Sequence, residues 1–517
     1  MKLLLLPFLA LFVFTTVVAQ PGALDSDFSA DGKVLETFDS GSERGGAVIV
    51  QPDGMILVGG FAYLQGDYDF VIVRYNSAGS LDNTFGGGTG KVSCNFGALY
   101  DDYAIDMVLE ANGNITLAGH TTSPSTGVYI CLARFLPDGE VDMSFGTFGQ
   151  VIVPTGSDYY VIEAMDVSST GKYAVTGRET PSTFFVAQFN NDGTIDTGFD
   201  TDGIVTFDPV VGMNKGNDIK YQSDGKLVVT GYYSGNLAIN VIVARYNTDG
   251  TLDNTFSLDG IVETDFLNNS ADEGSALHLY DNGKILVAGV TGSDIALIRY
   301  NSDGTLDLTF NGSGKKSIDF GAAESATAIT VQPDGKLLLA GTTDLGVSGD
   351  ARYMLARANS DGMVDNTFGT NGQVVTTFGS YDYAVLNSIA LQPNLRIVVT
   401  GGAGDLADAL DIATARYLSG LNLGVADFSS NGIIPLIYPN PVKQIETLEY
   451  TLLQNEVISI ELLNLNGSIV KTFVANAQRT TGAQRETLEF PADLAAGSYV
   501  IRLSSAAGQQ SIRLVKN

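Results

Sequence analysis

Four acidic residues recur at one position of a repeating pattern and offer the oxygen chemistry that binds hard cations. Glu43, Asp102, Asp272 and Glu324 each lie eleven residues before a turn glycine. The same position in three other segments holds Tyr160, Asn214 and Ala384, and Asp158 and Asp382 lie two residues before the first and last of these. Because Ca²⁺ prefers carboxylate oxygens, the pattern predicts a broken ring of carboxylates that binds Ca²⁺. No EF-hand loop is present, and the sequence indicates no other cofactor.

Paired tyrosines lie in the same segments as these acidic residues. The pairs are Tyr100 and Tyr103, Tyr159 and Tyr160, and Tyr381 and Tyr383. Aromatic rings stack on sugars and anchor protein partners, so we expect a face that binds a glycan or a protein. The alternative is ordinary surface tyrosine without a ligand, because Trp, the strongest sugar platform, is absent from the chain.

Catalytic patterns are missing from the sequence. His120 and His278 are the only histidines, and they lie in different repeats. The chain has no Gly-x-Ser-x-Gly elbow, no His-Glu-x-x-His helix and no phosphate-binding loop. The sequence therefore predicts a protein that is not an enzyme.

The residues above belong to a unit that is repeated seven times. Its first anchor is an apolar residue followed by Asp, two variable residues and Phe. It occurs at Leu24–Phe28, Leu81–Phe85, Val141–Phe145, Ile195–Phe199, Leu252–Phe256, Leu306–Phe310 and Val364–Phe368. A second anchor is an apolar run between two glycines, as in Gly54 to Gly59 and Gly283 to Gly289, and a third is Arg-aromatic-Asn. The repeated Asp and Arg suit turn hydrogen bonds and an ion pair between repeats, so we interpret them as structural.

Each unit contains four short predicted strands, which is the content of one β-propeller blade. The first unit has Lys33–Phe38, Ala47–Gln51, Met55–Gly59 and Phe70–Tyr75. Small residues predominate seven and nine positions before the turn glycine, so we place the second strand innermost, at the crowded axis. The first strand then completes the preceding blade, and Lys33–Phe38 closes the ring beside Ala413–Tyr417. A solenoid is the rival fold, but its repeats are shorter and its ends need distinct caps.

The units resemble the delta-60 repeats of bacterial exported proteins. The resemblance covers about 22–418 and rests on the Leu-Asp-x-x-Phe, Pro-Asp-Gly-Lys and Ala-Arg-Tyr-Asn patterns. It implies an all-β, seven-bladed propeller of four-stranded blades and says nothing about activity.

A different module follows a linker at 419–436. Six or seven short strands in 437–517 predict a small β-sandwich. This module resembles the sorting domain of the type IX secretion system of Bacteroidetes, through Tyr438-Pro439-Asn440-Pro441, Leu463 to Gly467, Gly497 to Leu503 and the basic end Arg513 to Lys516. The resemblance implies that the secretion machinery is a partner, and that the domain is removed after export. The alternative is an ordinary binding sandwich.

Residues 1–19 read as an export signal. Lys2 is followed by the apolar run Leu3–Val18, and cleavage after Ala19 would leave Gln20 at the new terminus. A membrane anchor is the competing interpretation, but the run is short for a span, and we expect no transmembrane segment. Cys94 and Cys131 are the only cysteines, and the sequence leaves open whether they form a bridge.

The formal net charge of -30 disfavours nucleic acid as a partner. Together these features predict a secreted or cell-surface propeller whose loop face binds a protein, a glycan or a cation. The alternatives are a glycan-active enzyme of the propeller type and a structural or adhesive surface component.

Overall fold

The computed structural model describes most of the chain outside its first 19 residues. The described residues are 20–38, 41–123, 127–153, 159–180, 183–207, 214–234, 239–266, 270–344, 350–379, 381, 383–405, 410–421, 436–438, 442, 445–452, 455–464, 469–491, 494, 497–505 and 508–516. The predicted export signal therefore lies outside the described residues. The chain separates into two compact units, Met1–Gly420 and Leu421–Asn517.

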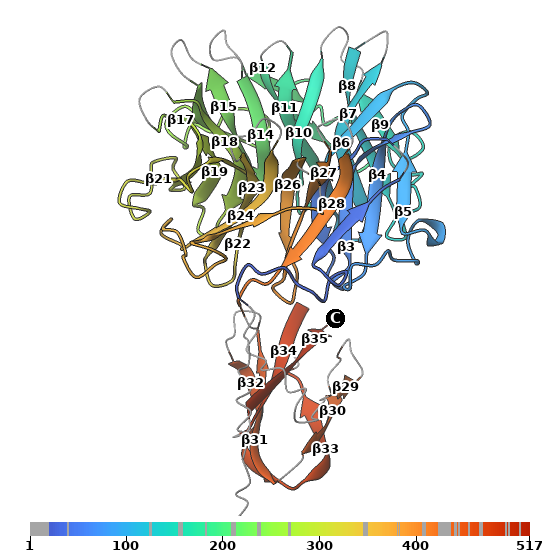
Figure 1. The fold of residues 1–517 in the computed structure, drawn as a ribbon, viewed down its shortest axis with the longest axis vertical. Helices are drawn as coiled ribbons and strands as arrows, with labels where there is room; N and C mark the ends of the chain where they lie inside the picture. Colours follow the sequence, from blue (N-terminus) through green and yellow to red (C-terminus); the bar gives the residue numbers. More distant parts are fainter. Residues whose placement is uncertain are drawn as a thin grey trace, which may run out of the picture. The chain divides into compact units, whose positions relative to one another are not determined.

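The first unit consists of seven antiparallel sheets of four strands each (Figure 1). The innermost strands are β2 (Glu43–Val50), β6 (Asp101–Leu109), β10 (Tyr160–Val167), β14 (Asn214–Tyr221), β18 (Asp272–Leu279), β22 (Ala323–Val331) and β26 (Tyr383–Leu391). The second strands are β3 (Ile56–Leu64), β7 (Ile115–Ser123), β11 (Tyr173–Glu179), β15 (Leu227–Ser234), β19 (Ile285–Thr291), β23 (Leu337–Asp344) and β27 (Ile397–Gly404).

The outermost strand of each sheet is short, with four residues. The third strands are β4 (Asp67–Tyr75), β8 (Gly127–Phe135), β12 (Thr183–Phe189), β16 (Ile239–Tyr246), β20 (Asp294–Tyr300), β24 (Ala351–Ala358) and β28 (Leu410–Tyr417). The outer strands are β5 (Lys91–Cys94), β9 (Gln150–Val153), β13 (Ile204–Phe207), β17 (Ile261–Thr264), β21 (Lys315–Ile318), β25 (Gln373–Thr376) and β1 (Lys33–Glu36). Within the described residues, the only helical element is a single 3₁₀ turn at Gly86–Gly88.

The seven sheets form a closed ring. Each innermost strand contacts the innermost strand of the next sheet, and β26 contacts β2. The predicted seven-bladed propeller with the second strand of each unit innermost is thereby confirmed, because an open solenoid would leave its first and last units apart.

The ring is closed by the amino-terminal segment. Strand β1 pairs with β28, with Lys33 opposite Ala415 and Glu36 opposite Ile412. Nearby, the Gly22 amide donates to the Leu418 carbonyl at 2.7 Å. The closure predicted from the sequence is confirmed, and it pairs the outer edge of β28, which would otherwise be exposed.

Every innermost strand carries a β-bulge near its middle. In the fifth blade, the register to β19 shifts between Gly274 and Ala276, so that Ser275 is the extra residue. The facing residue, Gly289, has no room for a side chain, since a Cβ there would lie 1.9 Å from the Glu273 carbonyl oxygen. The bulge therefore explains why a glycine recurs here. The residue equivalent to Gly289 in the first blade is Gly60. The second glycine of the anchor, which the sequence pattern placed at Gly59, is therefore Gly60.

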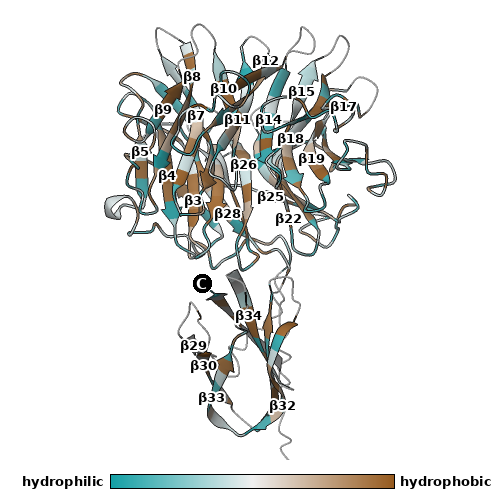
Figure 2. Cartoon of the chain, turned by 180° about the vertical axis from the view of Figure 1, so that it is seen from behind, coloured by the Kyte–Doolittle hydropathy of each residue, from teal (hydrophilic) through white to brown (hydrophobic). Residues whose placement is uncertain are grey.

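Apolar side chains fill the spaces between adjacent blades. One cluster joins Leu57 and Phe70 of the first blade to Met107 and Leu117 of the second. Burying one such side chain contributes roughly 1.5–3 kcal/mol. Figure 2 shows hydrophobic residues concentrated along the strands and hydrophilic residues in the turns. Cys94 and Cys131 are both buried in this cluster as free thiols.

The repeated Arg and Asp join neighbouring blades. Arg245 Nε donates to Asp253 Oδ2 at 2.7 Å within the fourth blade, and Arg245 Nη1 donates to the Ser302 carbonyl of the fifth at 2.6 Å. The same guanidinium lies 4.6 Å from the centre of the Phe256 ring. The equivalent arginines are Arg74, Arg134, Arg299, Arg357 and Arg416. The structural interpretation is confirmed with one correction: the ion pair lies within a blade, and a carbonyl bond crosses between blades.

The third blade lacks this arginine and replaces its charge. Gln188 occupies the arginine position, and Lys172 Nζ pairs with the anchor Asp196 at 2.5 Å. The lysine of the Pro-Asp-Gly-Lys turn makes the same pair in the sixth blade, where Lys336 lies 2.8 Å from Asp365. Every described anchor aspartate therefore has a cationic partner.

The second unit is a sandwich of two antiparallel sheets. One sheet has the order β29 (Leu436–Tyr438), β30 (Ile445–Leu452), β33 (Gly482–Glu489), and the other β32 (Ile469–Arg479), β31 (Glu456–Leu463), β34 (Gly497–Ser505), β35 (Gly508–Lys516). Leu448 and Leu488 of the first sheet share one core with Leu462 and Ile501 of the second. The predicted β-sandwich is confirmed, while Pro439 to Pro441 lie outside the described residues.

In the described part of the chain, no helix has the length and apolar character needed to cross a bilayer.

Candidate functional site

The two ends of the propeller differ in how uniform their loops are. At one end, five residues join the innermost strand to the second strand in all seven blades. At the other end, the second and third strands are joined by between two and six residues, and the outer strand is joined to the next innermost strand by between four and seven. We call the first end the constant face and the second end the variable face.

The four predicted metal ligands lie at the variable face but do not form a ring around the axis. Glu43, Asp102 and Asp272 are fully buried, and Glu324 is 2% exposed. Each accepts a backbone N–H from the loop that precedes its strand, as Asp102 Oδ2 does from Phe96 at 2.8 Å and Asp272 Oδ2 from Phe266 at 2.6 Å. Their carboxylates therefore hold the loops of separate blades.

The expected channel-mouth ring is wrong because side chains alternate along a strand. The residues that face the axis are the next ones along each strand, such as Arg44 after Glu43 and Glu273 after Asp272. Of the remaining expected positions, Tyr160, Asn214 and Ala384 are buried, while Asp158 and Asp382 lie outside the described residues.

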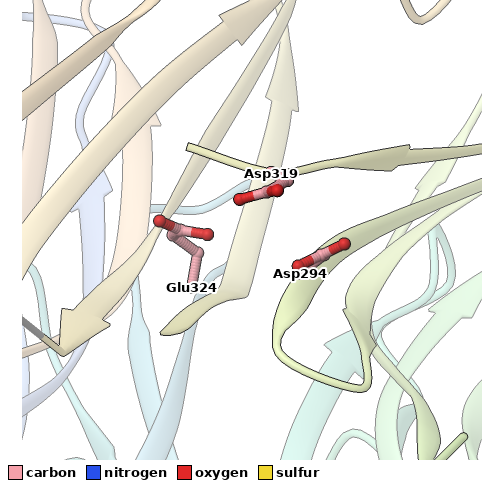
Figure 3. A group of neighbouring side chains, drawn as sticks. All are labelled: Asp294, Asp319 and Glu324. Atoms are coloured by element: carbon pink, nitrogen blue, oxygen red, sulfur yellow. The ribbon is translucent and has the colours of Figure 1, made fainter. Parts of the chain in front are cut away.

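Of the four predicted ligands, only Glu324 lies close enough to other carboxylates of the described residues to share an ion with them. Oxygen atoms of Asp294, Asp319 and Glu324 lie within 4.8 Å of one another, and Figure 3 shows the three side chains. Glu324 also accepts backbone N–H groups from Phe320 and Ala322, and Asp319 accepts one from Gly321 at 2.6 Å. Because Ca²⁺ takes six to eight oxygen ligands, this group supplies part of a shell at most. Ca²⁺ binding stays a prediction, which calorimetry of the apo protein with added CaCl₂ would test.

The tyrosines of the predicted pairs differ in how exposed they are. Tyr159 is 46% exposed, whereas its neighbour Tyr160 is buried with its ring 4.9 Å from that of Phe185. Tyr103 lies on the variable face in a group of touching rings that also contains Phe61, Tyr63, Tyr68 and His120.

The other tyrosines lie near the last blade and the second blade. The Tyr381 hydroxyl donates to Asp411 Oδ2 at 3.3 Å. Tyr383 begins β26 and is half-buried, and Tyr100 is half-buried in the loop before β6. The exposed aromatic surface of the variable face is thus carried mainly by Tyr159 and Tyr63.

Both histidines are held toward their neutral form. Burial lowers the pKa of His120 to about 4, with Arg178 adding to the effect, so the ring is neutral. Burial also lowers the pKa of His278, whose ring packs against Tyr280.

A polar cavity of about 360 Å³ lies on the propeller axis near the variable face. We call it the axial cavity. Its lining includes the charged side chains of Arg44, Glu163, Lys215 and Glu273. The extra residue of the bulge lines the cavity in all seven blades. These residues are Gly46, Ile105, Glu163, Asn217, Ser275, Thr327 and Asn387. The bulges therefore build the cavity by turning one more residue of each blade toward the axis.

Deeper on the axis, aspartates join neighbouring blades. Asp106, Asp166 and Asp218 each accept a backbone N–H from the following blade, at 2.8, 2.7 and 2.7 Å respectively. Lys220 lies among them, 3.3 Å from Asp218. Although burial opposes its charge, the carboxylates of Asp218, Asp166 and Asp106 raise the pKa of Lys220. These groups are engaged with one another and hold the inner ring together.

Sequence reasoning missed the axial cavity. Of its charged residues, Glu163 lies eight positions before the turn glycine, and Arg44, Lys215 and Glu273 lie ten positions before it, on either side of the small residue at position nine. Small residues nine before that glycine, such as Gly45, meet the adjacent blade and not the axis, since a Cβ there would lie 2.6 Å from Thr400 Oγ1. Charged residues next to the small residue at position nine were the available signal.

Two families match parts of the chain. Residues 51–85, 110–145, 169–199, 222–256, 281–310 and 332–368 match the family described as a domain of unknown function (DUF5122) beta-propeller. Residues 436–517 match the secretion system C-terminal sorting domain. No curated protein matches the chain.

Solved structures with similar folds are distant in sequence. A polysaccharide lyase is 10% identical, with 73% of this chain and 90% of that chain covered and a TM-score of 0.42. A gluconolactonase from Xanthomonas campestris is 13% identical, with 74% and 97% covered and a TM-score of 0.35. A protein of unknown function from Dyadobacter fermentans is 12% identical, with 75% and 98% covered and a TM-score of 0.39. At these values the similarities carry no argument about function.

Proposed function

The chain carries DUF5122 β-propeller repeats and a secretion system C-terminal sorting domain. We propose that it is a secreted, non-catalytic binding protein, and that its variable face contacts an extracellular protein or glycan. The sorting domain supports export by secretion machinery that recognises residues 436–517. After export, the propeller presents its variable face at or beyond the cell surface.

The difference between the two faces is the observation that carries this proposal. The constant face has the same five-residue turn between the innermost and second strands of every blade. Loops that differ in length from blade to blade add nothing to closure, but they produce an asymmetric surface that can fit one partner. Exposed Tyr63 and Tyr159 add aromatic area to that surface.

Binding through one face is tested by substitutions matched between the faces. The mature chain, from residue 20, is applied to a glycan array and cross-linked to the surface of cells that produce it. Tyr63→Ala and Tyr159→Ala are expected to weaken the binding. Leu308→Ala and Met363→Ala remove exposed apolar side chains from the constant face and are expected to leave it unchanged. Equal loss in both pairs, or no saturable binding by the unmodified chain, would contradict the proposal and favour a structural surface component.

A further inference from the structure

The charges of the axial cavity do not all cancel in pairs. Lys215 Nζ lies 2.9 Å from Glu163 Oε1, which neutralises both. Arg44 donates from Nη2 to the neutral Asn387 amide oxygen at 2.6 Å, and no carboxylate of the described residues lies within ion-pair distance of it. The Glu273 carboxylate lines the same cavity, and no hydrogen bond joins this carboxylate to any described residue.

Arg44 is unusual among the half-buried and buried arginines of this propeller. The six arginines of the repeat each pair with an anchor aspartate. Burial lowers the pKa of Arg44, although Tyr383, Tyr353 and Glu163 act in the other direction. Burial likewise raises the pKa of Glu273, while Lys215 opposes it. A partly desolvated cation and a partly desolvated carboxylate each gain from a ligand that brings the opposite charge.

The two unmatched charges lie on opposite walls. Arg44 is on β2 of the first blade and Glu273 is on β18 of the fifth, and in a ring of seven the fifth blade lies across the axis from the first. Asn217, Ser275 and Thr327 line the cavity between them with amide and hydroxyl groups. A cavity with one positive wall, one negative wall and polar groups between fits a dipolar molecule.

We propose that the axial cavity binds a zwitterion of amino-acid or short-peptide size, with its carboxylate at Arg44 and its ammonium at Glu273. A volume of about 360 Å³ falls at the small end of the roughly 300–1,000 Å³ range of ligand pockets. A zwitterion has no net charge, so the -30 charge of the chain does not repel it as it would an anion. This inference rests on the proposed function, because the cavity lies beside the variable face.

Calorimetric titration of the mature chain tests the ligand class. The probes are glycine, diglycine, triglycine and tetraglycine, each also with an acetylated amine or an amidated carboxyl group. Saturable binding is expected for at least one free form, weakened roughly 10- to 100-fold by either block. The proposal is overturned if no free form binds, if blocked forms bind equally well, or if galacturonate binds while the glycine series does not.

Two substitutions then assign the ends of the ligand. Arg44→Gln is expected to remove the preference for a free carboxyl group, and Glu273→Gln the preference for a free amine, each with a loss of roughly 10- to 100-fold in affinity. Lys316→Gln on the outer strand β21 and Glu140→Gln on the constant face are the matched controls and are expected to bind normally. Thermal unfolding without ligand checks folding, and if one variant does not fold, the other decides alone. If either preference survives its substitution, the assignment is wrong. If the unmodified chain binds no member of the glycine series but still binds its partner at the variable face, the inference is overturned and the proposed function stands.

Discussion

Arg416 and Asp25 are 391 residues apart in sequence, yet Arg416 Nε donates to Asp25 Oδ2 at 2.8 Å. Both side chains are buried, and Arg396 Nε lies 3.0 Å from the same carboxylate oxygen. The Arg416 guanidinium also lies 4.8 Å from the centre of the Phe28 ring. The amino-terminal segment thus supplies the last blade with an anchor aspartate and an anchor phenylalanine as well as a strand.

Removing this carboxylate is expected to destabilise the propeller strongly. Asp25→Ala leaves Arg416 buried without its partner, which costs about 3–5 kcal/mol. Urea denaturation of the mature chain measures the change. Asp27→Ala removes an exposed carboxylate two residues away and is the control. Equal effects of the two substitutions would show that the ion pair does not hold the ring closed.

Adding a methyl group opposite the bulge is also expected to lower the stability of the propeller. In Gly289→Ala, the new Cβ would lie 1.9 Å from the Glu273 carbonyl oxygen, so two backbones must separate. We expect a loss of about 2 kcal/mol or more in the free energy of unfolding. In the control Gly198→Ala, the Cβ meets only an Asp196 side-chain oxygen at 3.2 Å. Stability that is unchanged by Gly289→Ala would mean that the bulge adapts easily.

Asp102 is expected to make the propeller less stable as the pH rises from about 4 to 7. Burial raises its pKa to about 7, against an unfolded value of about 3.9. The folded chain therefore holds a proton that the unfolded chain has lost in this range, and stability falls with a slope of at most about 1.4 kcal/mol per pH unit. Melting temperatures at pH 4.5, 5.5, 6.5 and 7.5 should show a shallower slope for Asp102→Asn. The neighbouring Asp101→Asn should keep the slope, and a slope identical in all three proteins would refute the assignment.

For the anchor aspartates we expect the opposite pH dependence: the stability that they contribute is lost as the pH falls. Although burial opposes its charge, hydrogen bonds from Lys284, Thr309 and Arg299 lower the pKa of Asp307. Its contribution is complete above the unfolded value of about 3.9 and is lost as the pH falls below it. Asp307→Asn is expected to destabilise the protein at pH 7 and to flatten the decline between pH 4 and 2. The exposed Asp281→Asn serves as the control in the same denaturation series.

Export is expected to require the second unit. Deleting 436–517 removes the sorting domain, so the propeller should accumulate inside the cell. Immunoblots of cell and medium fractions measure this, with Leu308→Ala on the constant face as an exported control. Undiminished export of the shortened chain would assign the sorting role elsewhere.

The architecture could be predicted because the same turn and strand residues recur at the same positions in each repeat. Turn glycines fixed the hairpins, and the small residues of Gly45 type correctly indicated the innermost strand, although they pack between blades. The candidate site was predicted less well. One bulge residue per blade, such as Ser275, leaves no local signature, and a shift of one residue exchanges the two faces of a strand. Glu43 was therefore assigned to the axis when its neighbour Arg44 lies there.

The pairing of Gly22 with Leu418 has a consequence for protein engineering. Where the first unit begins and ends, its backbone is already hydrogen-bonded across the joint, so a short peptide could join these points directly. New termini could then be opened at a constant-face turn, for instance between Asn282 and Gly283. Such a circular permutant would carry β26, β27, β28 and β1 of the last blade in one continuous stretch, and it would move the split to the fifth blade, where β18 and β19 would lie at opposite ends of the chain.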